Sequence, residues 1–451
     1  MSTLTAPPVE PVFAAFAAID WASKEHVVAS VPAAGGRIEI SKLKNTPEAV
    51  ELWAASLRQR FPGAPAAVAV EQKRGAVIYM LSKYDHLVLY PVPPTMSSSY
   101  RHAFFPSGAK DDNGDTLLLL DLLRHHRDRL LPLQQDTPDT RLLRFLTEER
   151  RGLVEQKVSV VQQLTDCVAQ YFPQVRTWFG PLDTPLPEAL LERWPSLQQL
   201  QHSHPGTLKR FLAEHRLWDN DRIVEQIRQI YAAVPATRDE VVLEACSRKT
   251  AACLAQLRVL RDQVAAYDKR IAAVTADHPD APIFSSLPGA GAALTPRLIA
   301  AFGTDRKQWR DAADLQRFSG IAPILVRSGN CSRVAMRRAC PKFVRQTFHE
   351  FAAHSLPFCP WAKLLYEHHL QGDKKNHHPA VRAVAFQWIR IVYRCWVNRE
   401  PYDERIYLAA QRRRNSPFGA RMRPTLESSF RTAPVFRSSS RKPERGFRHP
   451  G

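Results

Sequence analysis

The sequence predicts an α/β domain at the N-terminus, followed by long helices, a mainly helical C-terminal domain and a disordered basic tail. Within residues 13–135, short apolar runs bounded by turn residues alternate with amphipathic helical patterns, as in an α/β domain. Over 141–171 and 237–276, apolar residues recur at steps of three and four, which is typical of long helices. From Gln411 the chain is rich in Arg, Ser and Pro, a composition that favours disorder.

Length and charge narrow the class of protein. The chain has 451 residues, enough for two or three domains with substantial cores, and its hydrophobic fraction of 44% is ordinary for a folded protein. The formal net charge of +19 predicts a polyanionic partner, with nucleic acid in first place and an acidic membrane surface in second. Because no apolar run is long enough to cross a bilayer, we expect no membrane-spanning segment.

The seven cysteines are scattered along the chain without any Cys-x-x-Cys pair. This spacing indicates reduced thiols in a cytosolic protein, and neither a disulfide framework nor a zinc site. Residues 1–11 lack the basic and then apolar pattern of a signal peptide. We therefore expect a cytoplasmic protein, associated with the nucleoid.

The predicted N-terminal domain begins with an apolar run that ends at Asp20, as is typical of a strand buried on both faces. A second such strand, Ala66–Val70, ends in another carboxylate, Glu71. The expected elements, in order, are strands at 13–19, 26–31 and 37–43, a helix from Thr46, a strand at 66–70, a helix at 75–83, a strand at 87–92 and, after a loop, the helix that carries Asp112 and Asp115.

Asp112 and Asp115 lie three residues apart where a loop at 107–111 runs into an apolar helix. Their carboxylates therefore project from one face of that helix. Two interpretations are open: the acids favour the positive end of the helix dipole, or they form half of a Mg²⁺ site.

The order of these elements is the layout of the ribonuclease-H-like fold, with acids at the ends of two strands and at the start of the last helix. In that fold the carboxylates meet at one edge of the sheet, where hard oxygen ligands suit Mg²⁺. Two such ions can hold the attacking and the leaving oxygen of a phosphodiester. The alternative is that Asp20, Glu71, Asp112 and Asp115 are unrelated surface acids.

The two long helical patterns carry charged residues on their other faces. Two such helices could pair antiparallel, within the chain or between chains, so self-association is a further expectation. The stretch between them, at 173–236, is rich in proline and holds shorter amphipathic pieces. We interpret it as a small helical insertion of unknown role.

Two stretches of the C-terminal part suggest phosphate chemistry. Leu-Pro-Gly-x-Gly at 287–291, followed by a helix at 293–302, resembles a helix-hairpin-helix turn whose glycine amides can meet a phosphate, although Pro-Gly is also simply a turn. Ser328 lies in a loop, and the basic residues after it recur on about one helical face. Arginines there would hold phosphates and position the serine hydroxyl against a phosphorus atom, unless the loop is only a turn and the basic run only a solvated face. The histidine pairs at 368–369 and 377–378 have no convincing ligand set and are interpreted as surface or phosphate contacts.

The combination of motifs resembles the DEDD transposases of insertion-sequence family 110, the bridge-RNA-guided serine recombinases. The segment Ala-Ile-Asp-Trp-Ala at 18–22 matches the first motif of that family, and Lys-Asp-Asp-Asn-Gly-Asp-Thr at 110–116 is similar to its Lys-Ser/Thr-Asp-x-x-Asp-Ala. In the C-terminal part, Leu-Pro-Gly-x-Gly, Phe-Ser-Gly-Ile-Ala-Pro and Arg-Ser-Gly look like the second domain of the family. Asp111, Thr116 and Asn330-Cys331 depart from the family pattern, and Asp111 adds a spare acid.

The resemblance implies a recombinase in which Asp20, Glu71, Asp112 and Asp115 bind Mg²⁺, as a two-metal site, and Ser328 is the nucleophile. It also implies that a structured RNA encoded by the element pairs with target and donor DNA, so that the RNA makes most of the sequence choice. In such proteins the carboxylate site of one subunit works with the serine of another within a tetramer, so we expect a homo-oligomer. The expected nucleic-acid contacts are Lys110, Arg327, Arg333, Arg337, Arg338, Lys342 and Arg345.

The resemblance covers about residues 13 to 400 and gives the expected domains. They are a disordered N-terminus at 1–12, a RuvC-like catalytic domain at 13–135, a helical coiled-coil region at 136–280 with the insertion at 173–236, a C-terminal transposase domain at 281–405 and a disordered basic tail at 406–451.

Two other functions fit the same residues. One is a hydrolytic, junction-cutting nuclease that keeps the metal site and uses water as the nucleophile. The other is a non-catalytic nucleic-acid-binding protein carried by charge alone, whose binding would depend on salt and not on Mg²⁺.

Overall fold

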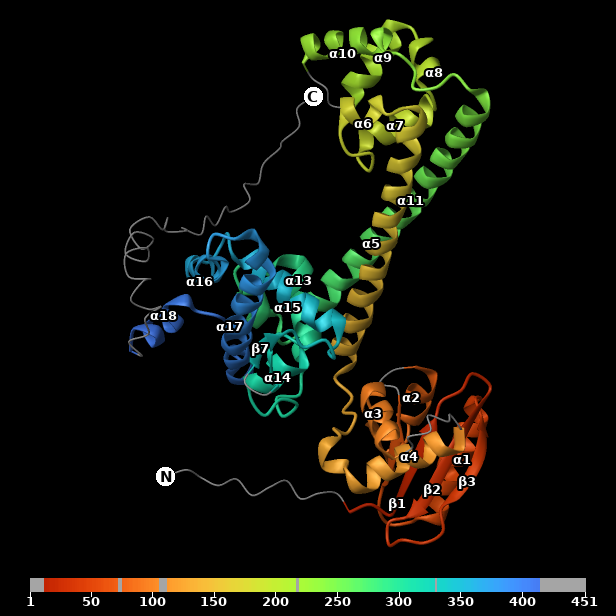
Figure 1. The fold of residues 1–451 in the computed structure, drawn as a ribbon, viewed down its shortest axis with the longest axis vertical. Coiled ribbons are helices and arrows are strands. Elements are labelled where there is room, and N and C mark those ends of the chain that lie inside the picture. Colours follow the sequence, from red (N-terminus) through yellow and green to blue (C-terminus); the bar gives the residue numbers. More distant parts are fainter. Residues whose placement is uncertain (1–11, 72–74, 105–111, 216–218, 329–330, 414–451) are drawn as a thin grey trace, which may run out of the picture. The chain divides into compact units, whose positions relative to one another are not determined.

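The computed structural model describes residues 12–71, 75–104, 112–215, 219–328 and 331–413, and the side chains of Asp112, Ser328 and Arg412 lie outside this description. The chain divides into two compact units, Met1–Gln135 and Asp136–Gly451, which are described separately. The first is α/β and the second is mainly helical, as predicted (Figure 1). No helix within the described residues is long and apolar enough to cross a bilayer.

The first unit is built on one five-stranded sheet with the order β3-β2-β1-β4-β5. Central strands β1 and β4 pair in parallel, as do β4 and β5, whereas β2 is antiparallel to both β1 and β3. This mixed order is consistent with a RuvC-like domain. The strands are β1 Ala15–Asp20, β2 Glu25–Pro32, β3 Glu39–Lys44, β4 Ala66–Val70 and β5 Leu87–Pro91.

Helices cover both faces of this sheet, because alternate residues of each central strand point to opposite sides. Ala17 and Ile19 of β1 share a core with helices α1 Pro47–Arg60 and α2 Ala76–Leu81. Ala18 of β1 shares a second core with α4 Asp112–His125 on the other face. The apolar runs of β1 and β4 are therefore buried on both sides, as expected for the strands that end in acids.

One helix of this unit was not expected: α3 Pro94–Phe104 stands where the sequence predicts a loop. The run Ser97-Ser98-Ser99 has weak helix propensity, so tertiary packing decides the conformation. Tyr100 packs against the α4 core and donates a hydrogen bond to Asp121. Burial, and to a smaller extent the Asp121 carboxylate, raise the pKa of Tyr100 to about 12. The α3–α4 connection contains residues 105–111, which lie outside the described residues and include Lys110 and Asp111.

In the second unit, the long helices α5 Pro138–Tyr171 and α11 Glu240–Ala276 pair antiparallel within the chain (Figure 1). Two contacts fix the register of the two helices. Arg150 forms an ion pair with Asp268, and the Cys167 thiol donates to the Cys246 carbonyl at 3.4 Å. At one end of this pair, short helices form a lobe, and they share an apolar core with the adjoining parts of α5 and α11. The short helices are α6 Gln174–Phe179, α7 Pro185–Arg193, α8 Leu197–Gln201, α9 Pro205–Glu214 and α10 Asn220–Ala232.

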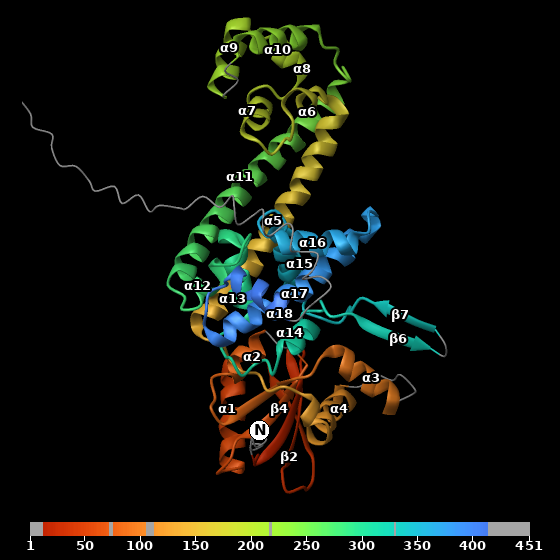
Figure 2. The ribbon, with the colours of Figure 1, turned by 90° about the vertical axis from the view of Figure 1, so that its left-hand side faces the viewer.

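The rest of the second unit is a helical body around an aromatic core that includes Phe302, Phe351, Trp361, Trp388 and Trp396. A two-stranded hairpin projects from this body (Figure 2). The elements are α12 Ala281–Ser285, α13 Gly291–Phe302, α14 Ala312–Phe318, β6 Ile324–Ser328, β7 Cys331–Ala335, α15 Lys342–Ser355, α16 Pro360–Leu370, α17 His377–Asn398 and α18 Glu404–Arg413, with a short 3₁₀ turn at Lys374–Asn376. A second 3₁₀ turn, Arg127–Arg129, belongs to the first unit.

Two expectations for this body are wrong. The basic residues after Ser328 do not share a helical face, because Arg333 lies on β7, Arg337 precedes α15 and only Lys342 and Arg345 lie on α15. The residues on either side of the Gly329-Asn330 pair form an antiparallel ladder instead of a helix. The disordered tail does not begin at 406, because α18 continues to Arg413 and its Leu408, 3% exposed, joins the core. Residues 414–451 lie outside the description.

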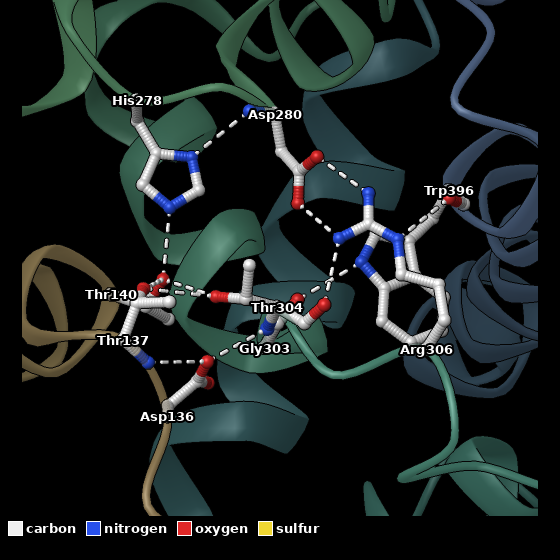
Figure 3. A network of polar contacts seen from close by, with 9 residues as sticks. All are labelled: Asp136, Thr137, Thr140, His278, Asp280, Gly303, Thr304, Arg306 and Trp396. Atoms are coloured by element: carbon white, nitrogen blue, oxygen red, sulfur yellow. Dashed lines mark hydrogen bonds and ion pairs between the residues drawn. The ribbon is translucent and has the colours of Figure 1, made fainter.

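A polar network ties the start of the long helix α5 to the helical body (Figure 3). Asp136 accepts hydrogen bonds from the amides of Thr137 and Thr304, at 3.1 and 2.9 Å. The buried His278 bridges the Asp280 amide, which donates to Nδ1, and the Thr140 hydroxyl, 2.8 Å from Nε2. Since Nδ1 accepts a hydrogen bond, the proton of the neutral ring is on Nε2. Burial disfavours the charged ring and so lowers the pKa of His278.

An arginine completes this network. Arg306 binds Asp280 through two nitrogens, donates to the Trp396 carbonyl at 3.2 Å and stacks over the Trp396 ring at 4.8 Å. Trp396 in turn donates to the Gly303 carbonyl at 2.9 Å. The α13–α14 connection is thus fixed to both α12 and α17, so α5 and α11 enter a rigid base.

The glycine of the Leu-Pro-Gly turn has a packing reason. Gly289 has φ +82°, and a Cβ there would lie 2.5 Å from the carbonyl oxygen of His354 in α15. Gly289→Ala should therefore destabilise the protein by about 2–4 kcal/mol, from backbone strain and overpacking together. Gly180→Ala is the matched control, because its φ is +81° but nothing lies within 4 Å of the added Cβ. Equal losses in urea unfolding for the two variants would show that the close approach to α15 has no energetic role.

Candidate active site

Two strand ends bring the first two acids to one edge of the sheet. Asp20 is the last residue of β1 and Glu71 directly follows β4. Because the two strands are parallel neighbours with Ile19 opposite Val70, the next residue of each strand leaves the sheet at the same edge. The sequence distance between the two acids is therefore irrelevant to their meeting.

Helix α4 supplies the third acid. Its apolar face packs on β1, β2 and β4, and Asp115, in the first turn, is only 8% exposed. Asp112 begins the same helix, but its side chain lies outside the described residues. A carboxylate interacts favourably with the positive end of the helix dipole, which explains why Asp115 is tolerated in the first turn. Because Asp115 is buried, its charge also needs a cation close by.

Helix α3 provides partners for Glu71 and Asp115. Arg101 Nη2 lies 2.7 Å from Asp115 Oδ1, and the side chains are 24% and 11% exposed. Buried Ser97 donates from Oγ to Glu71 Oε1 at 2.7 Å, which fixes that carboxylate. The helix that sequence reasoning missed therefore holds the two acids in place.

These side chains line one pocket of about 360 Å³. Its wall is made by Asp20, Trp21, Ala22, Glu25, Val27, Glu71, Arg101 and Asp115. Among the described residues of this wall, four carry carboxyl groups and one carries a guanidinium. The sequence analysis did not identify Glu25, whose position follows from the antiparallel return of β2 beside the end of β1, and Lys42 forms an ion pair with it at 3.0 Å.

The chemistry of this pocket suits a hard divalent cation, because carboxylate oxygens are the ligands that Mg²⁺ prefers. Within the described residues, no three potential ligands already converge on a single point, and Asp115 is held by Arg101. Arg101 thus supplies positive charge at the place where the acids need it.

The other predicted site residues belong to different places. Ser328 ends β6 in the second unit, and its side chain lies outside the description. Arg327 and Arg333 are exposed on the hairpin. Arg337 and Arg338 lie in the segment between β7 and α15, and Lys342 and Arg345 lie on the first turns of α15. Lys110 is among the residues that the structure does not describe.

Comparisons with known proteins match parts of the chain to transposase families. Residues 17–173 match a family model of the DEDD type of IS110 described as "Transposase", and residues 281–367 match one described as "Transposase IS116/IS110/IS902 family". The chain is 24% identical over 399 residues to "Mini-circle putative transposase for IS117" of Streptomyces coelicolor, covering 86% of this chain and 95% of the relative. It is also 24% identical over 315 residues to an IS116 protein of Streptomyces clavuligerus, covering 69% of this chain and 76% of the relative.

Removal of the Arg101 charge tests the electrostatics of the pocket. Arg101→Gln should lower the free energy of unfolding by about 2 kcal/mol in EDTA, because Asp115 is left buried without a cation. Arg58→Gln is a suitable control in the same unit, since Arg58 and Asp85 are 67% and 84% exposed at 3.5 Å, and it should cost less than about 0.5 kcal/mol. Urea unfolding measures both, and a loss no larger than that of the control would mean that Asp115 needs no counter-charge.

Proposed function

The chain belongs to the IS110 family of transposases, enzymes that cut and rejoin DNA, and from this premise we propose how it does so. We propose that Asp20, Glu71, Asp112 and Asp115 hold Mg²⁺ and that Ser328 is the nucleophile. The observation that carries this proposal is that Asp20, Glu71 and Asp115, from three separate elements, line one pocket.

The chain's own residues have distinct roles in this mechanism. Ser97 orients the Glu71 carboxylate, and Arg101 holds Asp115 in the pocket before the metal is loaded. When bound, Mg²⁺ would polarise the scissile phosphate and favour the ionised form of the serine hydroxyl.

The serine step is an exchange of phosphodiester bonds. The Ser328 oxygen forms a bond to phosphorus and loses its proton, while the bond from phosphorus to the leaving deoxyribose oxygen breaks and that oxygen takes up a proton. The hydroxyl of a second strand then attacks the phosphoserine link, restores the serine and completes the new DNA joint. No external energy source is needed, because each step replaces one phosphoester bond with another.

Partners and organisation follow from the family. We propose that an RNA encoded by the element guides the enzyme and that the active form is a homo-oligomer, dimer to tetramer, in which one subunit's acids work with another's serine. We further propose that residues 13–135 are the RuvC-like catalytic domain, 136–280 a coiled-coil connection and 281–405 the transposase domain. DNA is the substrate in each of these proposals.

The acid pocket is tested by single charge removal. Asp115→Asn and Glu71→Gln should each reduce Mg²⁺-dependent strand cutting by about 10²-fold or more, since each removes a ligand oxygen from the metal site. Asp85→Asn, at a carboxylate that is 84% exposed in the same unit, should keep full activity. Recombination between two plasmids is the assay, and full activity in either pocket variant would remove that residue from the mechanism.

The serine is tested by its covalent product. The wild-type enzyme incubated with labelled DNA, the RNA encoded by the element and Mg²⁺ should give a protein–DNA adduct on denaturing gels, and Ser328→Ala should give none. A Ser328→Ala protein that still cuts DNA would indicate water as the nucleophile, as in a junction-cutting nuclease. Binding of DNA without any Mg²⁺-dependent cutting in the wild type would indicate a non-catalytic protein.

A further inference from the structure

Cationic side chains form a stripe on α15 and a matching pair on α17. Lys342, Arg345 and His349 lie at i, i+3 and i+7 of α15, so they share one face of that helix. His378 and Arg382 lie at i and i+4 at the start of α17, which packs against α15. We refer to these five residues as the α15–α17 cationic cluster.

Arg345 and His349 of α15 lie near Arg382 and His378 of α17, whereas Lys342 is exposed. The rings of His349 and His378 lie 5.5 Å apart, and the rings of His377 and His378 lie 5.1 Å apart. Burial lowers the pKa of Arg382, and the nearby Arg345 lowers it further. Burial also lowers the pKa of His349, and the charged or titratable neighbours that lower it are His378, Arg382 and His377.

No carboxylate neutralises this cluster in the part of the chain that the structure describes. Arg345 reaches only the Arg337 carbonyl, at 3.5 Å, and Arg382 reaches only the Met336 sulfur, at 3.5 Å. The nearby acid on α15, Glu350, is bound by Arg151 and Arg297 and is not available to the cluster. Other partly buried arginines of this unit, such as Arg297 and Arg306, do form ion pairs.

Partly buried cations without acids are costly unless an anion from outside completes them. The ordinary anion for such a site in a DNA-cutting enzyme is a backbone phosphate, and arginine forks suit its geometry. The N-terminal end of α17, with no acid in its first turn, adds positive potential at the same place. A metal ion is not the ligand indicated here, because these histidines form no metal-binding group among the described residues.

We propose that the α15–α17 cationic cluster is a binding site for a DNA backbone phosphate, held by Arg345 and Arg382 and strengthened when His349 is protonated. The proposal rests on the proposed function only in taking DNA as the partner. Arg382 contacts Met336 in the segment that directly follows β7. The site is therefore next to the β6–β7 hairpin, whose first strand ends at Ser328.

The sign of the pH dependence follows from the neighbours of His349. Since cations and burial hold its pKa below the usual value, the ring is neutral at pH 7 in the free protein. A bound phosphate favours the protonated ring, so binding takes up protons. DNA affinity should therefore rise as the pH falls from 8 to 5.5.

The test is fluorescence anisotropy of a labelled DNA duplex with the full-length protein in EDTA, where no cutting occurs. Arg345→Gln/Arg382→Gln should weaken binding about 10-fold at pH 7 and reduce the slope of log affinity against log salt by roughly 1, since one phosphate contact is lost. His349→Gln should bind like the wild type at pH 8 and lose most of the gain at pH 5.5.

Matched controls separate the cluster from general charge. Arg228→Gln/Arg248→Gln removes the same net charge from arginines paired with Glu225 and Glu244, and His354→Gln removes an exposed histidine from α15 itself. Losses equal to those of the controls would overturn the proposal, as would losses confined to an RNA duplex of the same sequence. Because cutting is not measured, these results are independent of whether Asp115 and Ser328 act as proposed.

Discussion

The parallel pairing of β1 with β4 is the constraint on which the acid pocket depends. With Ile19 opposite Val70, both strands end in register, and Asp20 and Glu71 leave the sheet side by side. Alanines occupy much of both strands, so helices can pack closely on the two faces. One of these helices, α4, is thereby fixed against β1 with Asp115 directed to the same edge. A shift of one residue between the strands would exchange the two faces and move the acids apart.

Charge is distributed in two opposite ways in the two units. Among its described residues, the first unit gathers four carboxyl groups and one arginine around one pocket, which is an environment that a divalent cation stabilises. The second unit gathers cations on α15 and α17 without a carboxylate partner among the described residues, which is the environment that a phosphate stabilises. In the proposed reaction on DNA the two kinds of site have different roles, since the first would hold the metal and the second would hold the backbone.

Sequence reasoning succeeds where a local pattern decides the structure. The apolar runs that end at Asp20 and Glu71 are strands, and the apolar repeats of α5 and α11 are helices, because burial of the pattern requires those periods. It fails where packing decides the structure: α3 has a weak helical sequence but is held by Tyr100, and α18 lies at the start of the predicted tail but buries Leu408. Arg101 and Glu25 join the pocket through tertiary neighbours, and no spacing in the sequence indicates either contact.

The central claim is that acids from β1, β4 and α4 form one cation site. Titration calorimetry of Mn²⁺ into the full-length protein tests it most directly. The proteins to compare are the wild type, Asp20→Asn, Glu71→Gln and the double variant. If the acids share an ion, each single variant should bind Mn²⁺ at least about 10-fold more weakly, and the double variant should lose less than the sum of the two. Wild-type affinity in both single variants, or strictly additive losses, would contradict a shared site.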